Sequence, residues 1–314
     1  MNTVIRLVPY DQSMEKDWNE FVECSKNGTF LFNRGYMDYH KDRFRDNSIV
    51  FLRKGKIHSL LPACIKENII YSHAGLTYGG LVMNTSVTTS ETLEMFSLFK
   101  TYCVDNGIKG LVYKSVPYIY HSVPADEDLY ALFRNNSRLT ARSISSTVFS
   151  GDKIRFRELR RRGIKKGMQA GIEVKESDDL NSFWDILSSN LKDKYSTLPT
   201  HSLQEIIELK KKFPHNIRLF GAFDGEEMMG GVLCYFTKTC VHSQYISASP
   251  VGKEKGALDL IFDILINEIS DNYRYFDFGI STKDGGKYLN ESLIYQKEGF
   301  GGRAVCYDTY TMEI

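Results

Sequence analysis

This 314-residue sequence lacks any hydrophobic run long enough to cross a membrane. Its most apolar stretch, Ala257–Ile269, carries Asp259, Asp263 and Glu268 and is far shorter than the roughly 20 residues that a transmembrane helix needs. The N-terminal residues also contain no apolar stretch of signal-peptide length. We therefore expect a soluble protein of the cytoplasm without a membrane span.

Paired cysteines and metal-ligand motifs are missing as well. The six cysteines form no C-x-x-C pair and have no neighbouring histidine partner, which predicts reduced thiols rather than a disulfide framework or a zinc site. The sequence also offers no Walker phosphate loop and no Ser-His-Asp order. We expect no metal cofactor. The cysteines are Cys24, Cys64, Cys103, Cys234, Cys240 and Cys306.

A strong charge of one sign is the third absence. The formal net charge is +1, which argues against a general nucleic-acid coat while leaving room for local basic patches. The hydrophobic content of 42% and the charged content of 25% are those of ordinary globular proteins. A chain of this length is long enough to form two domains of about 150 residues each.

Hydrophobic periodicity predicts two halves with the same element order, namely strand, two helices, hairpin, strand, helix and strand. We place the linker between about Ser143 and Phe156, which gives domains 1–150 and 151–314. The elements expected in the first half are Thr3–Val8, Met14–Ser25, Tyr36–Arg43, Ile49–Arg53, Ile57–Lys66, Leu76–Val82, Ser90–Asn106, Gly110–Val116 and Ser143–Phe149. Those of the second half are Arg155–Ala170, Ile172–Glu176, Leu180–Asp193, Ser202–Phe213, Ile217–Phe223, Met228–Phe236, His242–Ser249, Leu258–Asn272, Tyr273–Gly279, a helix around Tyr288–Gly302 and Ala304–Met312.

The order hairpin, strand, loop, helix, strand is that of the GNAT acyltransferase fold, and specific segments strengthen the likeness. LNESLIYQKEGFGG (Leu289–Gly302), RYFDFG (Arg274–Gly279) and RELRRRGIKKGMQAGIEV (Arg157–Val174) resemble segments of the FemAB-type peptidyltransferases and their acyltransferase relatives. SHAGLTYGG (Ser72–Gly80) and KYSTLPTHS (Lys194–Ser202) resemble a bacterial subgroup of GNAT-family proteins. The resemblance implies an α/β fold of mixed sheets with two tandem GNAT-like domains.

A glycine-containing basic loop is expected at Val251–Leu258. Backbone amides at the start of a helix attract phosphate, and lysines add positive charge. In GNAT enzymes the corresponding loop binds the pyrophosphate of coenzyme A, so the resemblance implies an acyl-coenzyme A donor here. The alternative is a flexible loop with exposed lysines. The residues concerned are Gly252, Lys253, Lys255, Gly256 and Ala257.

Lys297 and Asp277 are the candidate catalytic residues. Leu289, Leu293 and Lys297 recur every four residues, so we expect Lys297 on the inward face of its helix. The resemblance implies a lysine at this position that stabilises the transition state of acyl transfer, whereas the alternative is a cation that suits the negative end of the helix dipole. Strand alternation places Asp277 on the strand face opposite to that of Phe276. There it would act as a general base for an amine, or it would accept hydrogen bonds from a neighbouring loop.

Further candidates would hold the acceptor. His242, Gln244 and Tyr245 lie on the expected cleft strand, where His242 and Gln244 should share one face. The predicted helix Arg155–Ala170 carries a basic stripe that includes Arg161 and Lys165. This stripe would bind a phosphate-bearing acceptor, coenzyme A or an aminoacyl-tRNA, or it is a solvated helix face. Tyr195 follows from the subgroup resemblance alone. In the first half, Tyr36, His73 and Tyr78 stand near glycines that suit either an acceptor wall or plain turns.

These residues lead to a functional hypothesis with two rivals. The leading hypothesis is a transferase that moves an acyl group from an acyl-coenzyme A thioester to an amine, for example on an amino sugar or a cell-envelope precursor. The first alternative is an aminoacyl-tRNA-dependent, FemAB-like peptidyltransferase, in which the basic helix Arg155–Ala170 would bind the tRNA. The second is a non-catalytic binding protein with degenerate GNAT domains. The first-half loop at residues 84–89 has neither glycine nor a basic residue, so we expect donor binding in the second domain only.

Overall fold

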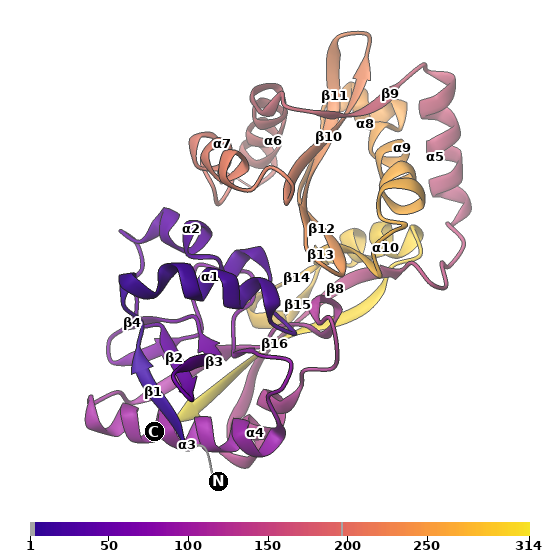
Figure 1. Cartoon of the computed structure of the whole chain (residues 1–314). Coiled ribbons are helices and arrows are strands. Elements are labelled where there is room, and N and C mark those ends of the chain that lie inside the picture. Colours follow the sequence, from indigo (N-terminus) through magenta and orange to yellow (C-terminus); the bar gives the residue numbers. More distant parts are fainter. Residues whose placement is uncertain (1–3, 196) are drawn as a thin grey trace. The chain divides into compact units, whose positions relative to one another are not determined.

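The chain forms two compact units (Figure 1). This computed structural model describes residues 4–195 and 197–314, without the side chain of Tyr195. Unit 1 comprises residues up to Ser143 together with Thr282–Tyr288 and Cys306–Ile314, and unit 2 comprises Ile144–Ser281 and Leu289–Val305. The C-terminal residues therefore belong to unit 1 and not to the second predicted domain. The reason is strand pairing, because Thr309–Glu313 pair with Gly110–Lys114 of unit 1.

Unit 1 contains an antiparallel sheet in the order β1-β2-β3-β6 and a second run of strands in the order β4-β5-β7-β16. Its strands are β1 (Ile5–Pro9), β2 (Ile49–Arg53), β3 (Lys56–Leu61), β4 (Cys64–Lys66), β5 (Ile69–Tyr71), β6 (Val82–Met83), β7 (Gly110–Lys114) and part of β16 (Arg303–Glu313). Its helices are η1 (Gln12–Met14), α1 (Glu15–Cys24), η2 (Phe30–Phe32), α2 (Arg34–Met37), η3 (Asp38–His40), α3 (Thr89–Asp105), η4 (Tyr118–Tyr120) and α4 (Glu127–Arg134). The short elements β14 (Thr282–Lys283), η6 (Asp284–Gly286) and β15 (Tyr288–Leu289) come late in the chain.

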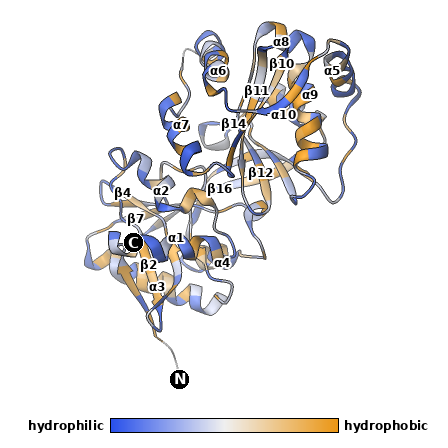
Figure 2. Cartoon of the chain, turned by 45° about the horizontal axis from the view of Figure 1, so that its top comes forward, coloured by the Kyte–Doolittle hydropathy of each residue, from blue (hydrophilic) through white to orange (hydrophobic). Residues whose placement is uncertain are grey.

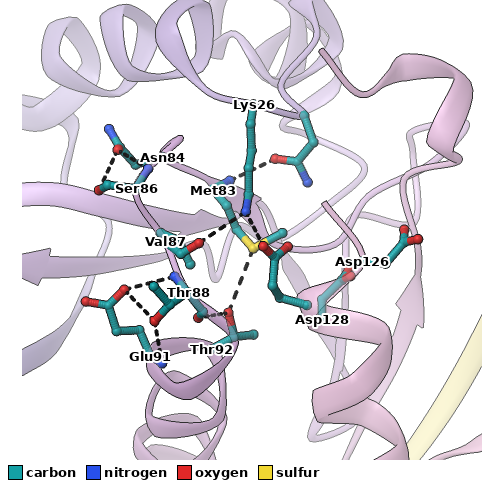
Figure 3. Close-up of polar contacts among 12 residues, drawn as sticks. Lys26, Met83, Asn84, Ser86, Val87, Thr88, Glu91, Thr92, Asp126 and Asp128 are labelled. Atoms are coloured by element: carbon teal, nitrogen blue, oxygen red, sulfur yellow. Dashed lines mark hydrogen bonds and ion pairs between the residues drawn. The ribbon is translucent and has the colours of Figure 1, made fainter. Parts of the chain in front are cut away.

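Polar contacts fix the start of α3 (Figure 3). Thr88 Oγ1 accepts a hydrogen bond from the Glu91 amide, and Glu91 Oε2 accepts one from the Thr88 amide at 2.9 Å. This reciprocal capping box satisfies two of the amides that a helix start leaves unpaired. Nearby, the buried Lys26 Nζ donates to the Val87 carbonyl at 3.3 Å and to Glu127 Oε1 at 2.5 Å. These contacts are structural, because a buried ammonium must be hydrogen-bonded.

Unit 2 is a mixed sheet in the order β8-β13-β12-β11-β10-β9, in which β12 and β13 are parallel and the other neighbours are antiparallel. In Figure 1, α6 and α7 lie on one side of the strands, and α5 and α9 lie on the other. Its strands are β8 (Arg138–Phe149, from residue 144 on), β9 (Glu173–Ser177), β10 (Ile217–Asp224), β11 (Glu227–Phe236), β12 (Cys240–Ala248) and β13 (Tyr275–Ile280). Its helices are α5 (Glu158–Gln169), α6 (Leu180–Tyr195), α7 (Leu203–Lys212), α8 (Pro250–Lys255), α9 (Ala257–Ile264), the π-helix η5 (Leu265–Ile269) and α10 (Glu291–Gly299).

The core of unit 2 lies between the sheet and α9. Phe262 of α9 contacts Phe276 and Phe278 of β13, and all three rings are buried. Phe300, directly after α10, stacks on Phe278 at a centroid distance of 5.7 Å. Figure 2 shows the apolar character of α9. Since these phenylalanines occupy one face of β13, alternation places Asp277 on the opposite face, toward the side of the sheet on which α6 and α7 lie.

Most predicted elements are present, but some differ and others are additional. The expected strand Leu76–Val82 is reduced to β6, and Ile57–Lys66 is interrupted between β3 and β4. Residues 251–255, predicted as a loop, belong to helix α8, because Ser249 caps it and Pro250 opens it. Strand β5 and helix α4 are additional elements that periodicity did not single out. Among the described residues, no helix is both long and apolar enough to cross a membrane.

Candidate active site

A wedge opens between the parallel strands β12 and β13. Their pairing runs from Cys240–Tyr275 to His242–Asp277 and stops there, although β12 continues to Ala248. A bulge in β12 shifts its register against β11 between Tyr245 and Ser243. Bulges bend a strand and increase its twist, so β12 turns away from its neighbour. Gln244 is the bulged residue, and the expectation that it shares a face with His242 by simple alternation is therefore wrong.

A cavity of about 570 Å³ lies at this wedge. Its wall includes residues of α6 from one side of the sheet and residues of α9 and α10 from the other. Most of these side chains are apolar, as in sites that bind organic ligands. The lining residues are Leu187, Asn190, Leu191, Asp193, Lys194, Ile246, Ser247, Ala248, Lys253, Leu258, Phe262, Phe278, Leu293, Gln296, Lys297 and Phe300.

Lys297 lies in the cavity wall and is 5% exposed. Its predicted burial is confirmed, whereas Leu289, the first residue of the predicted helical spacing, lies in β15 and is exposed. The ammonium donates hydrogen bonds to the carbonyls of Gly279 at 2.7 Å and Ile280 at 2.9 Å, at the end of β13. Burial lowers the pKa of Lys297 to about 8, while the charge of Asp277 opposes this effect. An ammonium has three N–H groups, so one remains for a ligand in the cavity.

The lowered pKa of Lys297 makes stability depend on pH. Between pH 8 and 10.5 the unfolded chain still holds this proton while the folded chain releases it, so the free energy of unfolding rises with pH. We expect wild type to gain up to about 3 kcal/mol over this interval relative to a Lys297→Met variant. Urea unfolding of both proteins at the two pH values measures the gain. Equal pH dependence in the two proteins would contradict a lowered lysine pKa.

Asp277 is fully buried and accepts side-chain hydrogen bonds from β8 and β12. Its Oδ1 accepts from the hydroxyls of Ser145 and Thr147, the latter at 2.8 Å, and its Oδ2 accepts from His242 Nδ1 at 2.8 Å. Burial raises the pKa of Asp277, but the hydrogen bonds and the His242 charge outweigh it and leave the pKa below its usual value. The carboxylate is thus held ionised beneath the imidazole.

The predicted donor loop has mainly packing contacts. A Cβ on Gly252 would collide with the Met229 carbonyl oxygen, and one on Gly256 with the Gly163 carbonyl oxygen of α5. The Gly252 amide donates to Ser249 Oγ at 3.0 Å. Gly256 has φ +80°, a conformation that favours glycine, and joins α8 to α9. Ala257 is buried in the core of unit 2.

The two lysines of this segment diverge. Lys255 forms an ion pair with Asp224 at the β10–β11 turn. Lys253 lines the cavity and donates from Nζ to Asn190 Oδ1 at 2.6 Å. Asn190 Nδ2 in turn donates to Ser247 Oγ at 2.8 Å and to the Ala248 carbonyl at 2.9 Å. Asn190 therefore ties α6 to β12 and holds Lys253 at the cavity.

The remaining second-half candidates are more scattered. Tyr245 packs against Trp184, and its hydroxyl contacts His201 Nδ1 at 2.7 Å and the side chain of Gln244. Burial raises the pKa of Tyr245. Arg161 is paired with Glu158, and Lys165 is exposed on the outer face of α5. Tyr195 ends α6, and its side chain lies outside the described part of the chain.

The first-half candidates are buried in unit 1. Tyr36 and Tyr78 are each 3% exposed, and they pack against Phe30 and Phe32 respectively. The Tyr78 hydroxyl donates to Thr29 Oγ1 at 3.1 Å. His73 has φ +57° and is also buried, and burial lowers its pKa to about 3. In this structure the three side chains belong to the interior of unit 1, and a role for them in acceptor binding stays a prediction.

Sequence reasoning missed three residues of this site. Asn190 lies in a helix whose periodicity shows only its apolar face. Ser145 and Thr147, on β8, contact Asp277 across 132 and 130 positions of sequence, and no local pattern marks such a contact. The alternation of β8 predicts that Ser145 and Thr147 share one strand face, but it does not predict which residue they contact. Among the described residues, no group of three or more histidine, cysteine or acidic side chains is arranged to hold a metal ion.

Comparisons with known proteins agree on the fold. Models of known protein families and curated protein sequences give no match. The solved structure of FemX covers 98% of this chain and 97% of its own, at a TM-score of 0.69 and 11% identity. The solved structure of a tandem GNAT protein from the clavulanic acid biosynthesis pathway covers 99% of this chain and 98% of its own, at a TM-score of 0.51 and 8% identity. This chain has a tandem-GNAT fold.

A further solved structure supports this tandem-GNAT fold. L-PGS from Bacillus licheniformis covers 97% of this chain and 92% of its own, at a TM-score of 0.61 and 12% identity. The mixed α/β architecture and the FemAB-like resemblance predicted from the sequence are thereby confirmed. At these identities the likeness concerns the fold, and the chemistry has to be argued from the residues of the cavity.

Proposed function

We propose that this tandem-GNAT protein transfers an acyl group from an activated carboxyl donor to an amine, in the cavity of unit 2. The observation that carries the proposal is Lys297, whose ammonium two backbone carbonyls hold at the wall of a largely apolar cavity. A fixed cation in a site of low dielectric stabilises negative charge that develops there, without reorganisation during the reaction.

The proposed reaction needs no covalent enzyme intermediate. The amine nitrogen attacks the donor carbonyl carbon, and the C–N bond forms while the carbonyl oxygen becomes an oxyanion. The bond to the leaving sulfur or oxygen then breaks, and the amine proton leaves to a base. Lys297 would donate to the oxyanion or to the leaving atom. Lys253, which Asn190 holds at the same cavity, would bind a phosphate of the donor.

An acyl-coenzyme A thioester is the first donor we propose, with the phosphates near Lys253. An aminoacyl-tRNA ester is the second, and two observations favour it. The glycines of the predicted phosphate loop pack against backbone, and the Gly252 amide is already used by Ser249. In addition, the outer face of α5 exposes Arg162, Lys165 and Lys166, which suit a phosphate backbone.

Filling the cavity should weaken donor binding. Leu293 is half-buried, lines the cavity and lies one helical turn before Lys297. A Leu293→Trp variant should weaken binding of the true donor by at least about tenfold, roughly 1.4 kcal/mol, because the indole occupies space meant for the ligand. Isothermal titration with acetyl-coenzyme A, a long-chain acyl-coenzyme A and a mixed aminoacyl-tRNA preparation identifies that donor.

The control is Leu289→Trp, because Leu289 is exposed and does not line the cavity. Equal donor affinity in both variants would place the donor elsewhere. If the donor binds but no acyl product with hydroxylamine or a panel of amines appears by mass spectrometry, the chain is a binding protein rather than a transferase. No binding of any of the three donors would overturn the proposal.

A further inference from the structure

The pair formed by His242 and Asp277 stands where the wedge begins. These two residues are the last register partners of β12 and β13 before the strands separate. The His242 ring lies over Gly279, with Cε1 3.3 Å from where a Cβ on that glycine would stand. The Gly279 carbonyl accepts from Lys297 Nζ at 2.7 Å. A single glycine therefore separates the imidazole from the proposed oxyanion stabiliser.

The two groups approach the wedge from opposite faces of the sheet. Phe276 and Phe278 face α9, so Asp277 and its partner His242 face the side of α6 and α7. Lys297 comes from α10, together with Phe300 and the α9 residues that line the cavity. His242 does not itself line the cavity, and its link to Lys297 runs through Gly279 at the edge of the wedge.

Hydrogen bonding determines which imidazole nitrogen carries the proton. Asp277 accepts from Ser145 and Thr147 on Oδ1 and from His242 Nδ1 on Oδ2. An ionised carboxylate can only accept, so Nδ1 carries a hydrogen, and in the neutral imidazole Nε2 then holds the lone pair. The imidazole side chain remains 11% exposed while Asp277 is 0% exposed, so the imidazole is the part of the pair that reaches solvent.

We propose that His242 is the general base of the acyl transfer and that Asp277 is its positioning residue. This inference rests on the proposed function. Nε2 takes the proton from the attacking amine as the C–N bond forms, and the imidazolium is then stabilised by the Asp277 carboxylate. The proton is later released to the leaving group or to solvent. The titratable groups next to His242 include Asp277 on β13 and Tyr235, its register partner on β11.

The first test is kinetic. A His242→Asn variant keeps a donor to Asp277 but has no base, so turnover should fall by about a hundred- to ten-thousandfold with donor affinity unchanged. The rise of turnover with pH that reports the imidazole should disappear. His215→Asn, at an exposed histidine, should behave as wild type. If His242→Asn does not fold, His242→Gln replaces it. Turnover within threefold of wild type, with the pH profile retained, would overturn the proposal.

The second test needs no substrate. Long-range ¹H–¹⁵N NMR of the ¹⁵N-histidine-labelled protein should show His242 as the Nδ1–H tautomer. An Asp277→Asn variant should lose that preference, because its amide can present a donor to the ring. An Nε2–H tautomer in the wild type would overturn the base assignment even if the protein proves to be an acyltransferase. Conversely, absence of any acyl donor would overturn the proposed function, whatever the tautomer.

Discussion

We expect Lys297→Met to bind its donor with near wild-type affinity and to turn over about a hundred- to a thousandfold more slowly, a loss of roughly 2.7–4 kcal/mol in transition-state stabilisation. Methionine keeps most of the side-chain volume and removes the cation that the Gly279 and Ile280 carbonyls hold at the cavity. The ammonium form is the useful one, so wild-type turnover should also decline as the pH rises through about 8.

Stability serves as the internal check on this variant. Two carbonyls lose their donor, which costs about 1–3 kcal/mol per unsatisfied group if they stay dry. Single-turnover kinetics separates this loss from the chemical step, because it is measured on folded protein at saturating donor. Lys287→Met, at an exposed lysine, is the matched control and should change neither quantity. Near-normal turnover of Lys297→Met would reduce Lys297 to a structural cation of α10.

The Asp277→Ala variant should lose about 3–5 kcal/mol of folding free energy, because it leaves three donors in the interior without their common acceptor. Those donors are Ser145 Oγ, Thr147 Oγ1 and His242 Nδ1. Denaturant unfolding at pH 7 measures the loss. Since the folded pKa lies below the ordinary 3.8, the wild-type advantage is complete above that pH and disappears as the pH falls through the folded value.

Asp271→Ala is the matched control for this substitution. Asp271 makes an exposed ion pair with Lys153, and such pairs contribute about 0–1 kcal/mol. A difference of less than 1 kcal/mol between the two alanine variants would show that the Asp277 contacts contribute little. The same measurement tests the proposed pairing with His242, because an Asp277→Ala/His242→Asn double variant should then be less destabilised than the sum of its parts.

Local patterns predicted most elements of the fold and one important residue of the site. The hairpin turn at Asp224–Gly225 and the capped helix α7 follow from signals within a few residues. Lys297 is buried as predicted, although of the two leucines in its predicted spacing Leu289 is exposed and Leu293 is half-buried. The loop assignment at 251–255 failed because glycine at two positions suggested freedom, whereas both glycines allow close contact with neighbouring backbone.

The sequence alone determined the tandem α/β order and Lys297 as an inward-facing cation. The tertiary structure decided the rest, and the physical reason is distance along the chain. Asp277 meets Ser145 and His242 only because β13 pairs between β8 and β12, and the bulge at Gln244 then opens the wedge. Strand neighbours and register are set by the packing of the whole sheet, so no window of local sequence contains them.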